Sequence, residues 1–224
     1  MSKNSYKKAA ILFSILLLPS LLYLWLNTGQ NHFTPLPILG PRQAVENGGE
    51  VDTIYHRIPP FSLTNQYGET ISTADVEGHI YIADFFFTSC PTICPKMATH
   101  MLQLQKRFGD RDDFLLVSYT IDPENDDVER LKQYAEKVHA KRGSWHFLTG
   151  ERDSIYQLAQ KGYFVSAMED EGAPGGYLHS GQFILIDKKG RIRGLFDGTS
   201  TADVNDLYDA IEILYREEYA SLKQ

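Results

Sequence analysis

Cys90 and Cys94 are the only cysteines of this 224-residue chain, and they lie in the hexapeptide CPTICP at residues 90–95. The hexapeptide joins a strongly apolar segment to one whose apolar residues recur at helical spacing. On a helical turn, two residues four positions apart project from the same face. The two sulfurs can then close a disulfide or share one soft metal ion. The pair, called the dicysteine below, therefore predicts redox chemistry or metal binding.

Spacing separates three interpretations of the dicysteine. A purely structural disulfide is least favoured, because a bridge across so short a loop removes little chain entropy. A thioredoxin-type redox pair has two residues between its cysteines, whereas three residues, 91–93, separate them here. Two thiolates with one added imidazole would instead form a soft site of low coordination number that suits copper. Copper binding is therefore favoured over thiol exchange.

The elements around the dicysteine predict how it is held. We expect apolar strands and amphipathic helices to alternate, which is typical of an α/β fold with helices on both faces of a mixed sheet. The expected strands are 80–87, 114–121, 145–149, 182–186 and 191–196, with a hairpin at 61–71 and helices at 92–108, 127–140, 153–161 and 202–222. Asp153 is the expected cap of the third helix, and Ser200 or Thr201 that of the last.

This order of elements is thioredoxin-like. The dicysteine falls at the carboxyl end of the first central strand, where open α/β sheets gather their ligands. We also expect the following helix N-terminus to lower the thiol pKa and to favour the thiolate that metal binding and thiol exchange both require.

His179 is the expected nitrogen ligand among seven histidines. It follows the glycine-rich loop 171–178 and enters the strand expected from residue 182, and in a thioredoxin-like fold this loop passes over the dicysteine. His100 lies about 600° around the helix from Cys94, which predicts a surface position. The others are expected in the tether, at strand borders or beside the turn at 141–143: His32, His56, His79, His139 and His146.

Taken together, these motifs resemble the SCO/SenC family of copper-binding assembly factors for cytochrome c oxidase. The shared pattern is C-P-x-x-C-P at a strand-to-helix junction, Asp-Pro after the next core strand, and a distant histidine before a strand that ends in D-x-x-G. These correspond here to residues 90–95, Asp122-Pro123, and His179 with residues 183–190. The match runs from about residue 58 to the C-terminus.

The resemblance implies that Cys90, Cys94 and His179 bind one copper, as Cu(I) or Cu(II), in a thioredoxin-like domain. It also implies a partner, the CuA domain of cytochrome c oxidase subunit II, to which copper is delivered or whose cysteines are reduced. Asp122 would support the ligands or the docking of this partner. Its simpler interpretation is a turn-forming aspartate before a proline.

The N-terminal residues predict an anchor. Three lysines within residues 3–8 precede the uncharged apolar stretch 9–26. We expect an uncleaved signal anchor at 1–27, a tether at 28–51 and one domain at 52–224, with the lysines cytoplasmic and the domain in the periplasm of a bacterium. A cleaved signal peptide is the alternative, but no small-x-small cleavage site follows the stretch.

Composition limits the class of function. The formal net charge of −7 and a pI near 5.5 make nucleic acid an unexpected partner. Two functions remain open: a membrane-anchored copper chaperone, and a thiol-disulfide reductase that keeps partner cysteines reduced. A peroxidase relative is a weaker third, since it needs an activating arginine near Cys90 that the sequence does not place there.

Overall fold

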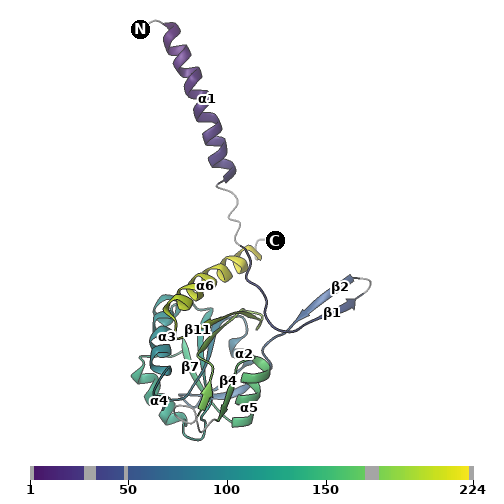
Figure 1. Cartoon of the computed structure of the whole chain (residues 1–224), viewed down its shortest axis with the longest axis vertical. Helices are drawn as coiled ribbons and strands as arrows, with labels where there is room; N and C mark the ends of the chain where they lie inside the picture. Colours follow the sequence, from purple (N-terminus) through teal and green to yellow (C-terminus); the bar gives the residue numbers. More distant parts are fainter. Residues whose placement is uncertain (1–2, 28–33, 48–49, 170–176, 222–224) are drawn as a thin grey trace. The chain divides into compact units, whose positions relative to one another are not determined.

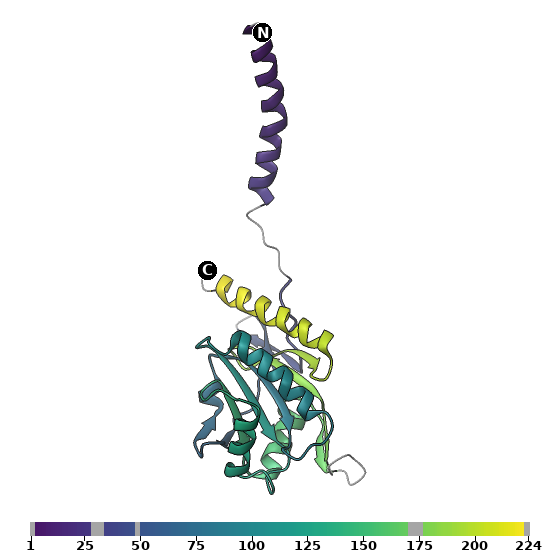
Figure 2. The same ribbon diagram turned by 90° about the vertical axis from the view of Figure 1, so that its left-hand side faces the viewer.

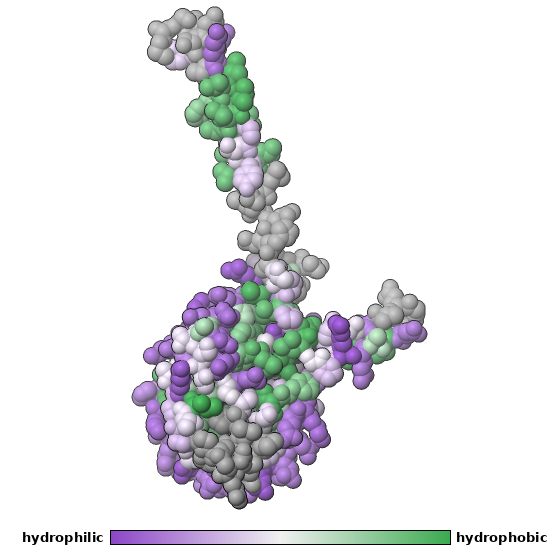
Figure 3. All heavy atoms as spheres, in the orientation of Figure 1, coloured by the Kyte–Doolittle hydropathy of each residue, from purple (hydrophilic) through white to green (hydrophobic). Residues whose placement is uncertain are grey.

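The computed structural model describes residues 3–27, 34–47, 50–169 and 177–221. The chain divides into two units, Met1–Thr34 and Pro35–Gln224. The first contains helix α1 (Lys3–Asn27), whose segment Tyr6–Leu24 has a mean hydropathy of 1.6. This segment is long and apolar enough to cross a membrane, and hydrophobic side chains gather along it in the space-filling view (Figure 3).

The second unit is built on a seven-stranded mixed sheet (Figure 1). Its spatial order is β11-β10-β5-β6-β7-β3-β4, and β5, β6 and β7 run parallel while the outer strands are antiparallel to their neighbours. The strands are β3 (Ser62–Asn65), β4 (Thr70–Ser72), β5 (Ile80–Phe86), β6 (Phe114–Thr120), β7 (Trp145–Thr149), β10 (Gln182–Ile186) and β11 (Ile192–Asp197). Every residue of β5 and β6 is buried, as their continuous apolar sequences predict.

Helices cover both faces of this sheet, which confirms the predicted fold class. On one face lie α3 (Cys94–Phe108), α4 (Val128–Lys137) and α6 (Thr201–Ser221), and α3 and α6 run side by side in Figure 2, in teal and yellow. On the other face lie α5 (Arg152–Gln157) and the π-helical turn Leu158–Gly162. A short helix, α2 (Thr73–Val76), follows β4.

The ring contacts of neighbouring β5 residues show why both faces are apolar. Phe86 packs against Tyr134 of α4 at 5.3 Å between ring centroids. Phe85 points to the other face and meets Tyr163, just after the π-helical turn, at 5.5 Å. Alternate side chains of a strand point to opposite faces, so a central strand buried on both sides must be apolar throughout.

Two local features differ from the sequence expectations, and one expected helix cap is confirmed. The segment expected as a tether, 28–51, overlaps an antiparallel hairpin that continues to residue 55, β1 (Arg42–Asn47) with β2 (Glu50–Tyr55). Glu151, and not Asp153, caps α5, because its carboxylate accepts hydrogen bonds from the backbone N–H groups of Asp153 and Ser154. For α6, Ser200 is the cap, since its hydroxyl accepts from Asp203 N at 3.3 Å.

Candidate metal centre

The dicysteine lies at the junction between β5 and α3. Cys90 belongs to the loop after β5, where its backbone N donates to Phe87 O at 3.2 Å, and Cys94 is the first residue of α3. Only 7% of Cys90 and 3% of Cys94 is exposed, and no disulfide joins them. A buried pair of thiols at a helix N-terminus is available for a metal ion or for oxidation to a disulfide.

The electrostatics of Cys94 differ from the sequence expectation. A hydrogen bond with the Cys90 side chain, together with burial, raises the pKa of the Cys94 thiol well above its usual range. A backbone hydrogen bond with Phe87 opposes this shift but does not cancel it. Because two adjacent sulfurs resist carrying two negative charges, the helix N-terminus alone does not produce a dithiolate here. A cation bound between the sulfurs would supply the missing countercharge.

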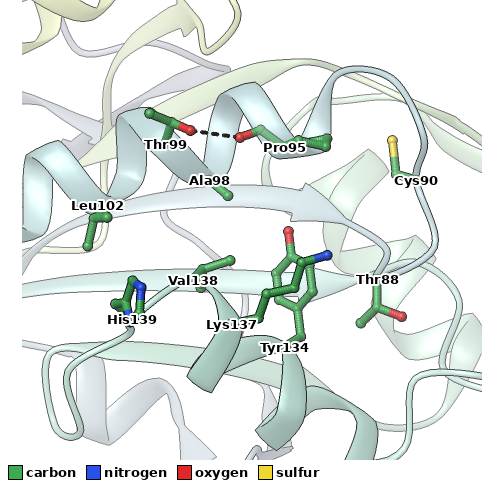
Figure 4. Close-up of a pocket in the computed structure, with 10 residues that line it drawn as sticks. All are labelled: Thr88, Cys90, Pro95, Ala98, Thr99, Leu102, Tyr134, Lys137, Val138 and His139. Carbon is green, nitrogen blue, oxygen red and sulfur yellow. Dashed lines mark hydrogen bonds between the residues drawn. The ribbon is translucent and has the colours of Figure 1, made fainter.

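The two sulfurs have different surroundings. Cys90 lines a groove between α3 and α4 and stands at one end of it (Figure 4). Cys94 instead lines a cavity of about 10 Å³ inside the domain, together with Asp84, Ser118 and Trp145. Cys90 is therefore the sulfur reached from outside, and Cys94 the one enclosed by the core.

Asp84 is a buried carboxylate on β5 that the sequence analysis does not single out. It accepts a hydrogen bond of 2.5 Å from the Ser118 hydroxyl, which in turn accepts one of 2.9 Å from Trp145 Nε1. Its negative charge also contributes to the raised pKa of Cys94. The available signal is a lone acid within the apolar run 80–87, since such a residue needs buried partners.

Asp126 holds the loop that carries Cys90, and it too is absent from the sequence-derived site. Its carboxylate accepts hydrogen bonds from the backbone N and the hydroxyl of Thr88, at 3.0 and 2.5 Å, and from the Thr120 hydroxyl at 2.6 Å. It thereby ties the loop after β5 to the end of β6. Burial raises the pKa of Asp126, although hydrogen bonds from Thr120 and Thr88 oppose the shift.

Asp122 forms a turn after β6. Its carboxylate oxygens accept from Asn125 Nδ2 at 3.0 and 3.1 Å, and its backbone carbonyl accepts from Asp126 N at 2.8 Å. The residue is 2% exposed. These contacts agree with the simpler, turn-forming interpretation, and they place Asp126 where it can hold Thr88.

The side chain of His179 lies outside the described residues, but its backbone forms part of β9 (Tyr177–His179), which pairs with β8 (Ala167–Glu169). Two residues later, Gly181 lies so close to α3 that an added Cβ would stand 3.4 Å from Cδ1 of Ile93, the residue before Cys94. The strand that contains His179 therefore leads directly to the dicysteine loop.

His100 is buried at 6% exposure, so the predicted surface position is wrong. It lies on the wide apolar stripe of α3, between Met97 and Leu104, where the loop after β11 packs against the helix. One ring nitrogen, Nδ1, pairs with Gly198 O at 2.8 Å, and Gly198 N donates to Gly181 O at 2.7 Å. His100 thus connects α3 to the segment that follows His179.

Three other described histidines have surroundings of their own. His56 Nε2 pairs with Gly162 O at 2.8 Å, His79 Nδ1 pairs with Glu77 O at 3.2 Å, and burial lowers the pKa of His146. Among the side chains that the structure describes, no three of the His, Cys, Asp and Glu type come together as a metal site. The two thiols fit a soft cation.

Comparisons with known proteins agree with this geometry. The SCO1/SenC family model matches residues 52–214. A SCO1/SenC family lipoprotein from Bacillus anthracis is 30% identical, with a TM-score of 0.66 over 71% of this chain and 95% of that one. BsSco, a member of the Sco family of cytochrome c oxidase assembly proteins that has a disulfide switch, is 31% identical, with a TM-score of 0.61 over 70% and 93%.

A third structure contains copper. ScoI of Arabidopsis thaliana, solved with copper bound, is 26% identical, with a TM-score of 0.59 over 71% of this chain and 98% of that one. The residues that the family model matches, 52–214, include the strand-to-helix junction of the dicysteine.

Proposed function

The chain belongs to the SCO1/SenC family, and from this premise we propose that it is a membrane-anchored copper chaperone that takes part in maturation of the CuA centre of cytochrome c oxidase. The observation that carries the proposal is the buried contact between Cys90 and Cys94 at the junction of β5 and α3. Copper bound to the related Arabidopsis protein supports the choice of metal.

In the proposed site, Cys90, Cys94 and His179 hold one copper ion. Two thiolates favour Cu(I), and an imidazole helps to retain Cu(II). Loading would displace the thiol protons, and the raised pKa of Cys94 makes uptake dependent on pH. Support for His179 comes from the position of Gly181 against Ile93 and from the backbone bond between Gly181 and Gly198.

The proposed location is the inner membrane of a bacterium, with α1 as a single span and the second unit in the periplasm. The apolar segment Tyr6–Leu24 supports a span, and Lys7 and Lys8 before its apolar centre support a cytoplasmic N-terminus. In this arrangement the partner is the CuA domain of oxidase subunit II.

The test is an anaerobic copper titration of the reduced full chain in detergent. Wild type should bind one copper and show a thiolate-to-Cu(II) absorption band. The band should vanish in Cys90→Ser and Cys94→Ser, and Cu(II) binding should fall strongly in His179→Ala. The matched control is His79→Ala, a half-buried histidine before β5 that should leave binding unchanged. Full Cu(II) binding by His179→Ala would remove His179 from the site.

Thiol-disulfide reduction of a partner is the second candidate. It is favoured by the contact between the two sulfurs and by the different access to Cys90 and Cys94. A related protein, BsSco, has a disulfide switch. This candidate predicts turnover that survives His179→Ala but is abolished by loss of either cysteine. Absence of tight copper binding, together with such turnover, would show that the protein is a reductase and not a copper chaperone.

A further inference from the structure

The groove that ends at Cys90 is a feature of the site that copper binding leaves unexplained. It runs between α3 and α4 and has a volume of about 230 Å³. Figure 4 shows Cys90 at one end, His139 and Leu102 at the other, and Tyr134 and Lys137 between them. A metal ion held by the dicysteine needs none of this space.

The size and walls of the groove favour a short stretch of polypeptide. Pockets for cofactors and other small molecules typically measure about 300–1,000 Å³, and this groove is smaller. Its walls combine apolar side chains, such as Leu102 and Val138, with the ring of Tyr134. A peptide segment of two or three side chains can pack against such walls, as partner residues do in the pockets of protein interfaces.

The charge of the groove differs from that of the protein as a whole. The chain has a net charge of −7, yet none of the residues that line the groove is an aspartate or glutamate. Lys137 is its one permanent cation and makes no ion pair within the part of the chain that the structure describes. Its side chain extends from α4 towards the end where Cys90 lies (Figure 4). The groove is therefore complementary to a negatively charged side chain.

We propose that this groove docks an extended segment of a partner protein, in which a cysteine thiol meets Cys90 and a carboxylate one or two residues away meets Lys137. The inference rests on the proposed function, because it assumes that a thiol-bearing partner exchanges with the dicysteine. It adds the recognition chemistry: an acidic, cysteine-containing segment enters between α3 and α4, on the side of Cys90 and away from Cys94.

The test measures how fast Cys90 captures charged and uncharged peptides. The full chain, carrying Cys94→Ser so that Cys90 is its single thiol, is kept copper-free in detergent. The probes are two hexapeptides whose one cysteine is activated as a mixed disulfide with thionitrobenzoate. One has glutamate two residues from the cysteine, and the other has glutamine there. Attack by the Cys90 thiolate forms the protein–peptide disulfide and releases coloured thionitrobenzoate.

We expect the glutamate peptide to react about five- to tenfold faster than the glutamine peptide. This ratio should fall to about one in Lys137→Glu. The matched control is Lys132→Glu, an exposed lysine of α4 outside the groove, which should keep the ratio. Should Lys137→Glu not fold, ionic strength replaces it: screening should shrink the ratio in the Lys137 protein as salt is raised.

Equal rates for the two peptides, or a ratio that persists in Lys137→Glu or at high salt, would overturn the docking proposal. Activated mercaptoacetate is the third probe, and a rate equal to that of the glutamate peptide would assign the groove to small carboxylated thiols. A parallel copper titration of wild type separates the two proposals. Failure to bind copper would refute the proposed function, whereas intact copper binding without charge selectivity would refute docking alone.

Discussion

Asp126 and Asp187 are both fully buried, yet they lie at opposite edges of the sheet and are satisfied by different chemistry. Asp126 stands beside the dicysteine and accepts hydrogen bonds from Thr88 and Thr120, with Arg130 Nε 3.6 Å away and half-exposed. Asp187 follows β10, whose Ile186 pairs with Tyr81 near the start of β5. Two arginines surround it, with Arg191 Nη2 at 2.7 Å and Arg193 Nη1 at 3.3 Å.

The cluster around Asp187 fastens the chain where it enters the domain. Arg193 is 4% exposed and also binds Glu217 of α6 at 2.6 Å, while its Nη2 and Nε donate to the carbonyls of Leu36 and Pro37. The buried carboxylates at this edge are therefore paired with arginines. At the other edge, uncharged hydroxyl groups donate most of the hydrogen bonds to the Asp126 carboxylate, and burial raises the pKa of this carboxyl. The comparison shows a rigid ionic attachment at one edge and a weaker polar connection beside the site.

The largest expected effect comes from breaking the ionic attachment. Arg193→Met leaves Glu217 without its buried partner and should lower the free energy of unfolding by about 3–5 kcal/mol. Urea denaturation of the full chain in detergent, followed by fluorescence, measures the loss. The control is Arg142→Met, because Arg142 pairs with Glu69 on the exposed surface and should cost far less. Equal losses would mean that the buried cluster adds no special stability.

Asp126→Asn should have an intermediate effect, a loss of about 1–3 kcal/mol at neutral pH, because an amide replaces only part of the accepting capacity. The pH dependence sharpens the comparison. Since burial raises the pKa of Asp126 above its ordinary value of 3.8, folding favours its protonated form. That contribution is complete below the ordinary value and is lost as pH rises through the raised pKa.

Urea denaturation from pH 3.5 to 7 tests the sign. The decline with rising pH that Asp126 causes should be absent in Asp126→Asn and present in the control Asp206→Asn, an exposed carboxylate of α6. Identical pH profiles for Asp126→Asn and wild type would show that hydroxyl groups hold the ionised carboxylate as well as arginines do.

His100→Leu should have the smallest effect on stability, about 1 kcal/mol, because it removes one hydrogen bond. The substitution should affect copper binding more than it affects the stability of the fold. Without the bond to Gly198, the Gly198–Gly181 connection is less firmly held against α3, and Cu(II) binding should weaken several-fold. A Cu(II) titration measures this, with His79→Leu as the control, since the His79 ring bonds only to the nearby Glu77 carbonyl among the contacts described. Unchanged Cu(II) affinity would mean that the segment after His179 is positioned without His100.

The sequence by itself determined the fold class and the dicysteine. Short apolar runs predict β5 to β7, β10 and β11, because strands buried on both faces must be apolar throughout, and apolar residues at a period of 3.6 predict α3, α4 and α6, all to within a few residues. The hexapeptide at residues 90–95 likewise predicts two adjacent sulfurs at the end of a central strand. His179 stays a prediction that the copper titration tests.

Only the tertiary structure decided what surrounds those sulfurs. Asp84, His100 and Asp126 have partners far away in the chain: Ser118 lies 34 positions from Asp84, Gly198 lies 98 positions from His100, and Thr88 lies 38 positions from Asp126. Local patterns do not report such contacts, because the long-range pairing of strands and helices creates them. The same pairing buries Cys94, leaves Cys90 at the end of a groove, and raises the thiol pKa that the helix N-terminus alone was expected to lower.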